Sequence, residues 1–181
     1  QWGGGWLASA GFSDFAGSTL VHSTGGAAAL AGALMLGPRL GRFTKSGAPA
    51  PLKPFAASSI PLVTIGVFIL WLGWFGFNGG SQLAMGTAVD AIAVSTIFMN
   101  TFLAGAGGVI GAAIITRLHF GKTDVVQMLN GCIGGLVAVT AEPLAPSPFA
   151  AILIGAVGGL IVVYGTKLLF SFKIDDVVGC L

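Results

Sequence analysis

The feature of this sequence that most restricts its fold is a set of five long intervals without a charged residue. They run from Phe15 to Pro38, Pro54 to Val89, Ala91 to Thr116, Val125 to Ala141 and Pro143 to Thr166. A helix needs roughly 17 to 25 apolar residues to cross a hydrocarbon core about 30 Å thick, and each interval is long enough. Only 8% of the chain is charged, against about 25% in a typical soluble domain. The sequence therefore predicts a membrane protein.

The intervals predict five transmembrane helices in one partial transmembrane domain that covers residues 1–181. The predicted spans are 16–37, 57–78, 90–115, 125–141 and 149–170. Transmembrane strands would be about half as long and would alternate apolar with polar residues, which these intervals do not do. We predict an all-α multi-pass membrane protein. The chain has no initiator Met or signal peptide and ends as another apolar run begins, so we expect a piece of a longer protein.

The basic residues predict how the chain is oriented in the membrane. They gather in the connections 38–53, 117–124 and 167–176, whereas the connections 79–89 and 142–148 contain no Lys or Arg. Cytoplasmic connections carry an excess of Lys and Arg. We therefore expect the three basic connections in the cytoplasm, the N-terminal segment outside, and the protein in a cell membrane, either a plasma membrane or a bacterial inner membrane.

Cysteine content and net charge exclude several classes of site. Cys132 and Cys180 lie in or beside apolar runs without metal-ligand spacing, and we interpret both as packing residues that form no disulfide. The net charge of +2 is too small to indicate a nucleic-acid partner. The sequence indicates no metal, no cofactor and no catalytic constellation.

Small residues recur at helical spacing in the predicted spans. Gly107 and Gly111 form one such pair, and the others are Gly131 with Gly135 and Gly155 with Gly159. Helices in lipid associate through close backbone contact at small residues, so these pairs predict a tight bundle. Gly25, Gly26, Ala29 and Gly32 have similar spacing in the first span. Small side chains also leave room for a narrow passage between helices.

A short motif occurs twice, at the two ends of the chain. Asp14-Phe15-Ala16-Gly17 precedes the first predicted span, and Asp176-Val177-Val178-Gly179 follows the fifth. Five crossings put the two motifs on opposite sides of the membrane, so equivalent elements would form inverted repeats, a common transporter architecture. Chance similarity between two helix starts is the alternative explanation of so short a match.

Asp14 and His22 are the ionisable residues at the start of the first span. An Asp just before a helix accepts hydrogen bonds from the free amides of the first turn, here near Ala16 and Gly17, so we interpret Asp14 as structural rather than as a cation ligand. His22 lies eight residues further, about 12 Å along a helix and near the membrane midplane. An ionisable side chain at that depth usually faces either the bundle interior or a pathway, and we favour the pathway for His22. A neutral imidazole both donates and accepts a hydrogen bond.

The segment Trp71-Leu72-Gly73-Trp74-Phe75-Gly76-Phe77-Asn78-Gly79-Gly80-Ser81 closes the second span. An interfacial aromatic belt would explain Trp71 and Trp74. It explains Phe77, Asn78 and Ser81 less well. A glycine-interrupted helix end beside aromatic faces could instead hold a small cation through cation–π attraction and a hydroxyl acceptor. Trp2 could add another aromatic face.

These residues resemble the signatures of the ammonium transporter (Amt) family, which is more distantly related to the Rh proteins. Asp14-Phe15-Ala16-Gly17-Ser18-Thr19-Leu20-Val21-His22 resembles the family's D-F/Y-A-G-G/S-x-x-V-H signature, and Gly73 to Ser81 supports it. The resemblance implies an eleven-span protomer with inverted five-helix repeats, incomplete here, in which this chain is spans five to nine and the start of the tenth. It also implies a homotrimer with one pore per protomer.

The resemblance assigns roles to individual residues. Trp2 and Ser81 resemble the outer cation site, Phe77 one of two gate phenylalanines, His22 the first of two pore histidines, and Trp74 a pore-lining tryptophan. Asp14 resembles the family's buried structural aspartate, and Asp176 would be its counterpart in the second repeat. The second histidine would follow Asp176 by eight residues, beyond Leu181, so we do not expect the chain alone to conduct.

The leading hypothesis is transport of ammonium or ammonia through a hydrophobic pore in the lipid bilayer. A cytoplasmic regulatory protein is a further expected partner. The alternative of another class is an ammonium sensor, in which a signalling domain follows the membrane domain. An Rh-like gas channel is disfavoured by Trp2 and Ser81. A membrane enzyme is the weakest alternative, because His119 lies in a basic connection with Arg117 and Lys122 and no nucleophile accompanies it.

Overall fold

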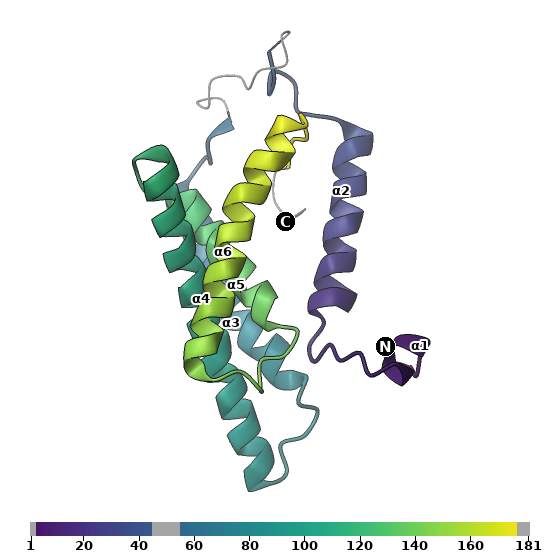
Figure 1. The fold of residues 1–181 in the computed structure, drawn as a ribbon. Coiled ribbons are helices and arrows are strands. Elements are labelled where there is room, and N and C mark those ends of the chain that lie inside the picture. Colours follow the sequence, from purple (N-terminus) through teal and green to yellow (C-terminus); the bar gives the residue numbers. More distant parts are fainter. Residues whose placement is uncertain (1–2, 45–54, 177–181) are drawn as a thin grey trace.

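The computed structural model describes residues 3–44 and 55–176, and its elements are helices (Figure 1). A four-residue helix α1 (Trp6–Ser9) precedes a π-helix η1 (Ser18–Ser23), which continues directly into α2 (Thr24–Leu36). After the connection 37–59 come α3 (Ile60–Gly80), α4 (Ala88–Phe120), α5 (Val125–Val139) and α6 (Pro148–Ser171). The prediction of an all-α protein is confirmed.

Capping residues fix where the long helices begin. Ser59, Asp124 and Ser147 each accept a hydrogen bond from an amide three residues on, at the starts of α3, α5 and α6. Thr87 and Asp90 form a reciprocal capping box at the start of α4, which satisfies two otherwise free groups of the first turn. α4 therefore begins before the predicted residue 90. It ends at Gly121, whose φ of 73° stops the helix.

Glycines form the contacts between α4, α5 and α6, which pack closely on one another. A Cβ at Gly107 would strike the carbonyl of Ile152, and one at Gly155 would strike the carbonyl of Ala104. A Cβ at Gly135 would also strike the carbonyl of Ala104. The helices therefore meet backbone to backbone, as the small-residue pairs predicted. Gly25 and Gly32 of α2 differ, because within the described residues nothing would lie within 4 Å of a Cβ at either one.

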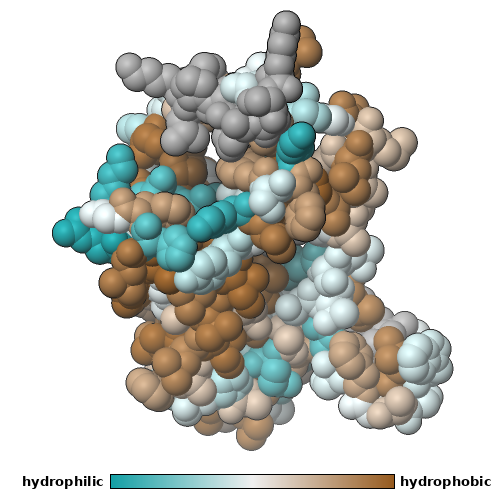
Figure 2. All heavy atoms as spheres, turned by 45° about the horizontal axis from the view of Figure 1, so that its top comes forward, coloured by the Kyte–Doolittle hydropathy of each residue, from teal (hydrophilic) through white to brown (hydrophobic). Residues whose placement is uncertain are grey.

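The outer surface of the bundle is apolar. Leu62, Ile65, Phe68 and Ile69 are between 54% and 68% exposed along α3, and Figure 2 shows hydrophobic residues over much of the visible flank. Water would penalise so large an exposed apolar area, whereas lipid does not. Four helical stretches of the described residues are long and apolar enough to cross a membrane: Ser18–Leu36, Ile60–Gly80, Ala88–Phe120 and Pro148–Ser171.

A helical segment occupies most of each of the five predicted spans, and α5 is the shortest of the long helices α3 to α6. It has 15 residues, below the roughly 17 that a helix needs to cross the hydrocarbon core. Its predicted span, 125–141, ran two residues further, where the chain turns at Thr140 and Ala141. The five-span boundaries remain a prediction.

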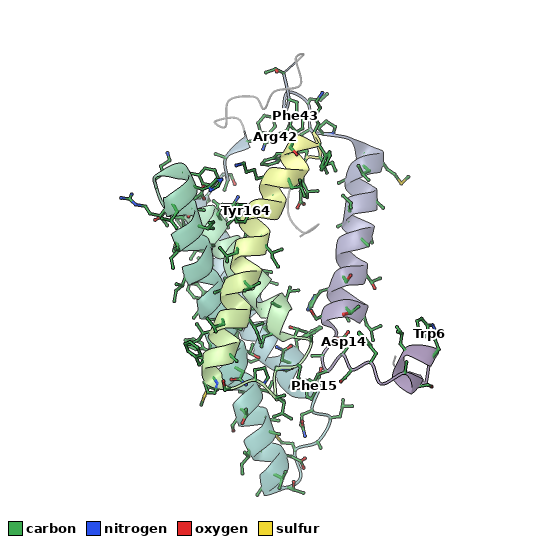
Figure 3. The ribbon with its side chains drawn as sticks, in the orientation of Figure 1. Trp6, Asp14, Phe15, Arg42, Phe43 and Tyr164 are labelled. Atoms are coloured by element: carbon green, nitrogen blue, oxygen red, sulfur yellow. The ribbon has the colours of Figure 1, made fainter. Side chains whose placement is uncertain are left out.

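α2 stands apart from the bundle of α3 to α6 (Figure 1). It has no buried residue and, among the described residues, makes helix-to-helix contacts only with η1. The η1–α2 arm is joined to the bundle at its two ends. Figure 3 shows Asp14 and Phe15 at one junction and Arg42 and Phe43 at the other.

An ionic cluster in which Asp175 and Arg42 are buried and Arg39 is partly exposed forms the second junction. Asp175, just after α6, accepts hydrogen bonds from Arg39 Nε at 2.7 Å and Nη2 at 2.9 Å, and from Arg42 Nε at 3.2 Å. The Arg42 guanidinium is buried and lies over the ring of Phe170, 4.4 Å from its centroid. Hydrogen bonding from Arg39, together with the charges of both arginines, lowers the pKa of Asp175 to about 2. We call Arg39, Arg42 and Asp175 the arginine clasp.

Candidate functional site

The segment that leads into η1 is bonded to the end of α5. The amides of Phe15 and Ala16 donate to the carbonyls of Ala141 and Thr140 at 2.7 and 3.1 Å. The Ser18 hydroxyl donates to the carbonyl of Val137 at 2.9 Å. These bonds satisfy carbonyls that the last turn of a helix leaves free and hold the start of η1 against the bundle.

The Asp14 carboxylate organises the first turn of η1. It is 1% exposed, and its Oδ2 accepts hydrogen bonds from the amides of Thr19 at 3.1 Å and Leu20 at 2.9 Å. The predicted partners near Ala16 and Gly17 are therefore wrong. The helix begins only at Ser18 because Gly17 adopts the left-handed conformation, with φ of 109°, which a residue with a side chain rarely adopts.

The π-helix was not predicted, and it changes where His22 lies. Residues 14–17 are not helical, so only the four steps from Ser18 contribute helical rise, about 6 Å at most at the α-helical value rather than the predicted 12 Å from Asp14. The amides of Val21 and His22 both donate to the carbonyl of Gly17. π-helical turns are rare in proteins, and many of those that occur lie at functional sites.

Three aromatic rings from two elements meet at the end of η1. The ring centroid of His22 lies 5.1 Å from that of Trp74, stacked at 25°, and 5.3 Å from that of Phe77, tilted at 32°. Trp74 and Phe77 are 6.1 Å apart, one turn from each other on α3. The structure thus brings together three predicted site residues. Among the described residues, the buried Nε2 of His22 has no hydrogen-bond partner.

Thr140 links this aromatic cluster to the Asp14 segment, and sequence reasoning missed it. Its hydroxyl accepts a hydrogen bond from Trp74 Nε1 at 2.9 Å and donates to the carbonyl of Leu136 at 2.6 Å, while its carbonyl accepts from Ala16. One fully buried residue therefore orients the indole ring and fixes the segment that carries His22. In the sequence, Thr140 is one threonine at a helix end, without a pattern that distinguishes it.

The remaining predicted residues lie outside this cluster. Ser81 is one turn beyond Phe77 at the end of α3, and its hydroxyl donates to the Phe77 carbonyl at 2.9 Å. Trp2 lies outside the described residues. Asp176 follows α6. In a second repeat its hydrogen-bond partners would stand five and six residues further on, as Thr19 and Leu20 follow Asp14. Those positions begin at residue 181, outside the described range.

The sequence model of the Ammonium Transporter Family matches residues 1–181, the full length of the chain. The chain belongs to the ammonium transporter family. This confirms the resemblance, and with it a multi-pass protein that is integral to a membrane. The Asp14 to His22 signature thus occurs in a family member, on a segment that the structure bonds to the end of α5.

Similar ammonium transporters occur in archaea and other organisms. The chain is 43% identical to ammonium transporter Amt2 of Archaeoglobus fulgidus over 99% of its own length and 39% of that protein. It is 38% identical to ammonium transporter Amt1 of Haloferax mediterranei over 98% of its length and 36% of that protein. The chain therefore spans between about 31% and 40% of the length of these and other curated relatives that it matches.

Solved structures of the family share the fold. A sensor Amt protein superimposes with a TM-score of 0.86 at 36% identity, over 97% of this chain and 42% of that one. Mep2 of Candida albicans superimposes with a TM-score of 0.83 at 31% identity, over 98% of this chain and 37% of that one. The predicted ammonium transporter fold is confirmed.

Proposed function

We propose that this chain forms part of a pore that carries ammonium or ammonia across a membrane, in the context of a longer protomer. The observation that supports this proposal most directly is the aromatic enclosure of His22 by Trp74 and Phe77. The imidazole has a buried, unpartnered Nε2, and the surrounding rings are apolar. A small solute that can donate or accept a hydrogen bond would find a partner there.

The proposed pathway follows one face of α3. Ser81, with Trp2, forms the outer cation site, Phe77 gates the entry, and Trp74 and His22 line the lumen. The residues 74, 77 and 81 recur at intervals of three and four, which places them on one side of a helix. Ser81 lies about 10 Å beyond Trp74 along the axis, so the cation site and the histidine occupy successive levels.

Desolvation explains why the two levels would handle different species. Moving an unpaired ammonium ion from water into a low-dielectric lumen costs several kcal/mol or more of solvation free energy. Neutral ammonia does not carry this penalty. The outer groups would therefore bind the cation, and ammonia would pass His22 after loss of a proton. In this proposal Asp14 and Asp176 are structural, and a second histidine eight residues after Asp176 would pair with His22.

Uptake measurements on the full-length protein test the proposal. His22→Ala should reduce uptake of labelled methylammonium at least tenfold, because the solute loses its hydrogen-bond partner in the lumen. Ser23→Ala, an exposed neighbour, is the matched control and should retain uptake. Undiminished uptake by His22→Ala at equal surface expression would refute the pore assignment.

A homotrimer, a cytoplasmic regulatory partner and a non-enzymatic role all belong to the same proposal. The second candidate function is that of an ammonium sensor, favoured by the similarity to a sensor Amt protein. A sensor needs a signalling domain attached to the membrane domain, and a transporter does not. A kinase or cyclase domain after the last span of the full-length protein would favour the sensor, and transport without such a domain would favour the transporter.

A further inference from the structure

A short, proline-rich connection joins α5 to α6, and a side chain of α4 binds it at two points. We call residues 141–147, which include Pro143 and Pro146, the proline loop. Proline has no backbone N–H, so this loop can form few backbone hydrogen bonds of its own. The Asn100 carboxamide of α4 donates through Nδ2 to the Pro143 carbonyl at 2.9 Å and to the Pro146 carbonyl at 2.8 Å. Both of its N–H groups are thereby used.

Asn100 is fully buried inside the bundle, so its contacts do not depend on what covers the outer surface. Among the described residues its buried Oδ1 has no hydrogen-bond partner. An unpaired acceptor in the interior costs free energy that an apolar side chain of the same size would avoid. The two bonds to the proline loop are therefore what this asparagine contributes.

The proline loop lies next to the segment that carries His22. The carbonyl of Ala141, the first residue of the loop, accepts the 2.7 Å hydrogen bond from the Phe15 amide. Pro143 follows Ala141 by two residues, a stretch of chain that spans at most about 7 Å. A shift of the Pro143 carbonyl, which Asn100 holds, would therefore move the carbonyl that holds Phe15.

Glu142 makes the proline loop stiff where it leaves α5. Its amide donates to the Val139 carbonyl at 3.1 Å, which continues the last turn of the helix. Its Oε1 accepts hydrogen bonds from the amides of Leu144 and Ala145 at 3.2 and 3.3 Å. Because Glu142 bonds the helix on one side and the loop on the other, a displacement at Pro143 passes to the end of α5 instead of being absorbed within the loop.

The next residue of α4 holds the other half of the aromatic cluster. Thr101 accepts a hydrogen bond from Asn78 Nδ2 at 3.0 Å, and Asn78 follows Phe77 on α3. Adjacent residues of α4 therefore bind α3 on one side and the proline loop on the other. Without the bonds of Asn100, α3 would keep its attachment to α4, whereas the side of the cluster that carries His22 would lose one.

We propose that Asn100 is a positioning residue of the pore. Its two hydrogen bonds to the proline loop hold the end of α5 where it binds the segment before η1, and so set the place of the His22 ring beside Trp74. Asn100 acts through these backbone contacts rather than by contact with the solute. The effect on transport rests on the proposed function, whereas the effect on the segment around His22 does not.

Hydrogen exchange of the full-length protein in detergent, measured by mass spectrometry on a peptide that covers residues 15–22, tests this role. Asn100→Thr removes both amide donors with little change in side-chain volume, and its hydroxyl can bond a carbonyl one turn back, as that of Thr116 does. The amides of the peptide should exchange about tenfold faster, which corresponds to about 1.4 kcal/mol of opening free energy. Asn100→Ala should do the same. Unchanged exchange in either folded variant would refute the proposal.

Thr116→Val is the matched control, because Thr116 is a second fully buried side chain of α4 that holds a turn. Its hydroxyl accepts a hydrogen bond from the Asp124 amide at 3.5 Å, at the opposite end of α5 from the proline loop. Exchange of residues 15–22 should stay within about twofold of the wild type. Equal acceleration by Asn100→Thr and Thr116→Val would contradict the proposal, because it would indicate a general loosening of α4.

Uptake of labelled methylammonium measures the consequence for transport. Asn100→Thr should lower the maximal rate per folded protein at least about threefold through the misplaced imidazole, and should leave KM near the wild-type value, since Ser81 of the proposed outer site lies on α3. Combined with Thr140→Val, which acts through the same segment, it should reduce uptake little further. Multiplicative losses in the double variant, or a raised KM at an unchanged maximal rate, would overturn the proposal. Absence of uptake by the wild type would instead refute the proposed function, and the exchange result would still decide the role of Asn100.

Discussion

The arginine clasp should stabilise the folded protein measurably, since within the described residues it is one of two places where the η1–α2 arm is joined to the bundle. We consider Asp175→Asn in the full-length protein. The pKa of Asp175 falls from 3.8 to about 2 through its bonds to Arg39 and the charges of both arginines, and each pKa unit corresponds to about 1.4 kcal/mol. The carboxylate therefore contributes about 2 kcal/mol, less a part screened by solvent because Arg39 is 44% exposed.

Asp175→Asn should lower the free energy of unfolding by about 1 to 2 kcal/mol, and Asp175→Ala by about 3 to 5 kcal/mol, because Ala leaves the buried Arg42 guanidinium without its bonded partner. Unfolding in mixed micelles, followed by circular dichroism, measures both. Glu142→Gln is a matched control, since among residues 3–44 and 55–176 Glu142 Oε1 accepts only from the amides of Leu144 and Ala145, and a Gln oxygen can replace it. It should change stability by less than about 0.5 kcal/mol, as surface substitutions usually do.

The pH dependence has a definite sign. Because the folded-state pKa lies below the ordinary value of 3.8, the contribution of Asp175 is complete above about pH 5 and is lost as the pH falls toward 2. Asp175→Asn should lack this part of the acid loss. A double-mutant cycle with Arg42→Met should give a coupling energy above about 0.5 kcal/mol, the range found for bonded pairs. Additive single effects would refute the clasp as a stabilising unit.

Three further predictions concern the glycine contacts, the aromatic cluster and a helix cap. Gly155→Leu should prevent stable folding, measured as monodisperse yield, whereas Gly73→Leu, with open space around its Cβ, should express normally; equal yields would contradict the packing argument. Trp74→Phe removes the bond to Thr140 and should cost about 1 kcal/mol of stability and reduce uptake; wild-type values for both would contradict its role. Thr87→Ala breaks the capping box and should cost about 1 kcal/mol in unfolding experiments; an unchanged value would show that the cap contributes nothing.

Helix positions could be predicted from the sequence because lipid leaves few alternatives. Uncharged intervals indicated five helices, and the caps that adjust their ends depend on nearby residues, as with Thr87 just before α4 and Asp90 in its first turn. The glycine pairs also predicted the contacts, since a helix surface without side chains admits another backbone. These features depend on residues close together in the chain, so the sequence contains the information they require.

The site was predicted only in part, because its geometry depends on contacts between distant residues. His22, Trp74 and Phe77 were named from their motifs, but nothing in the sequence placed Thr140 against Trp74, 66 residues away. The π-helix was missed for a related reason. It depends on the left-handed conformation of Gly17 and on the bonds that join Phe15 and Ala16 to the end of α5.

The position of His22 is set by the start of its helix rather than by the body of α2. α2 has no buried residue and makes no helix-to-helix contact with the described bundle, so packing along α2 does not fix the imidazole. The constraint comes from Asp14, which holds the amides of Thr19 and Leu20, and from Thr140, which holds both Ala16 and the Trp74 indole. Any change that frees Thr140 should therefore displace the imidazole and the indole together. Thr140→Val should impair uptake through both rings, although within the described residues the hydroxyl and carbonyl of Thr140 bond Trp74, Leu136 and Ala16 and not His22 or Ser81 of the proposed outer site.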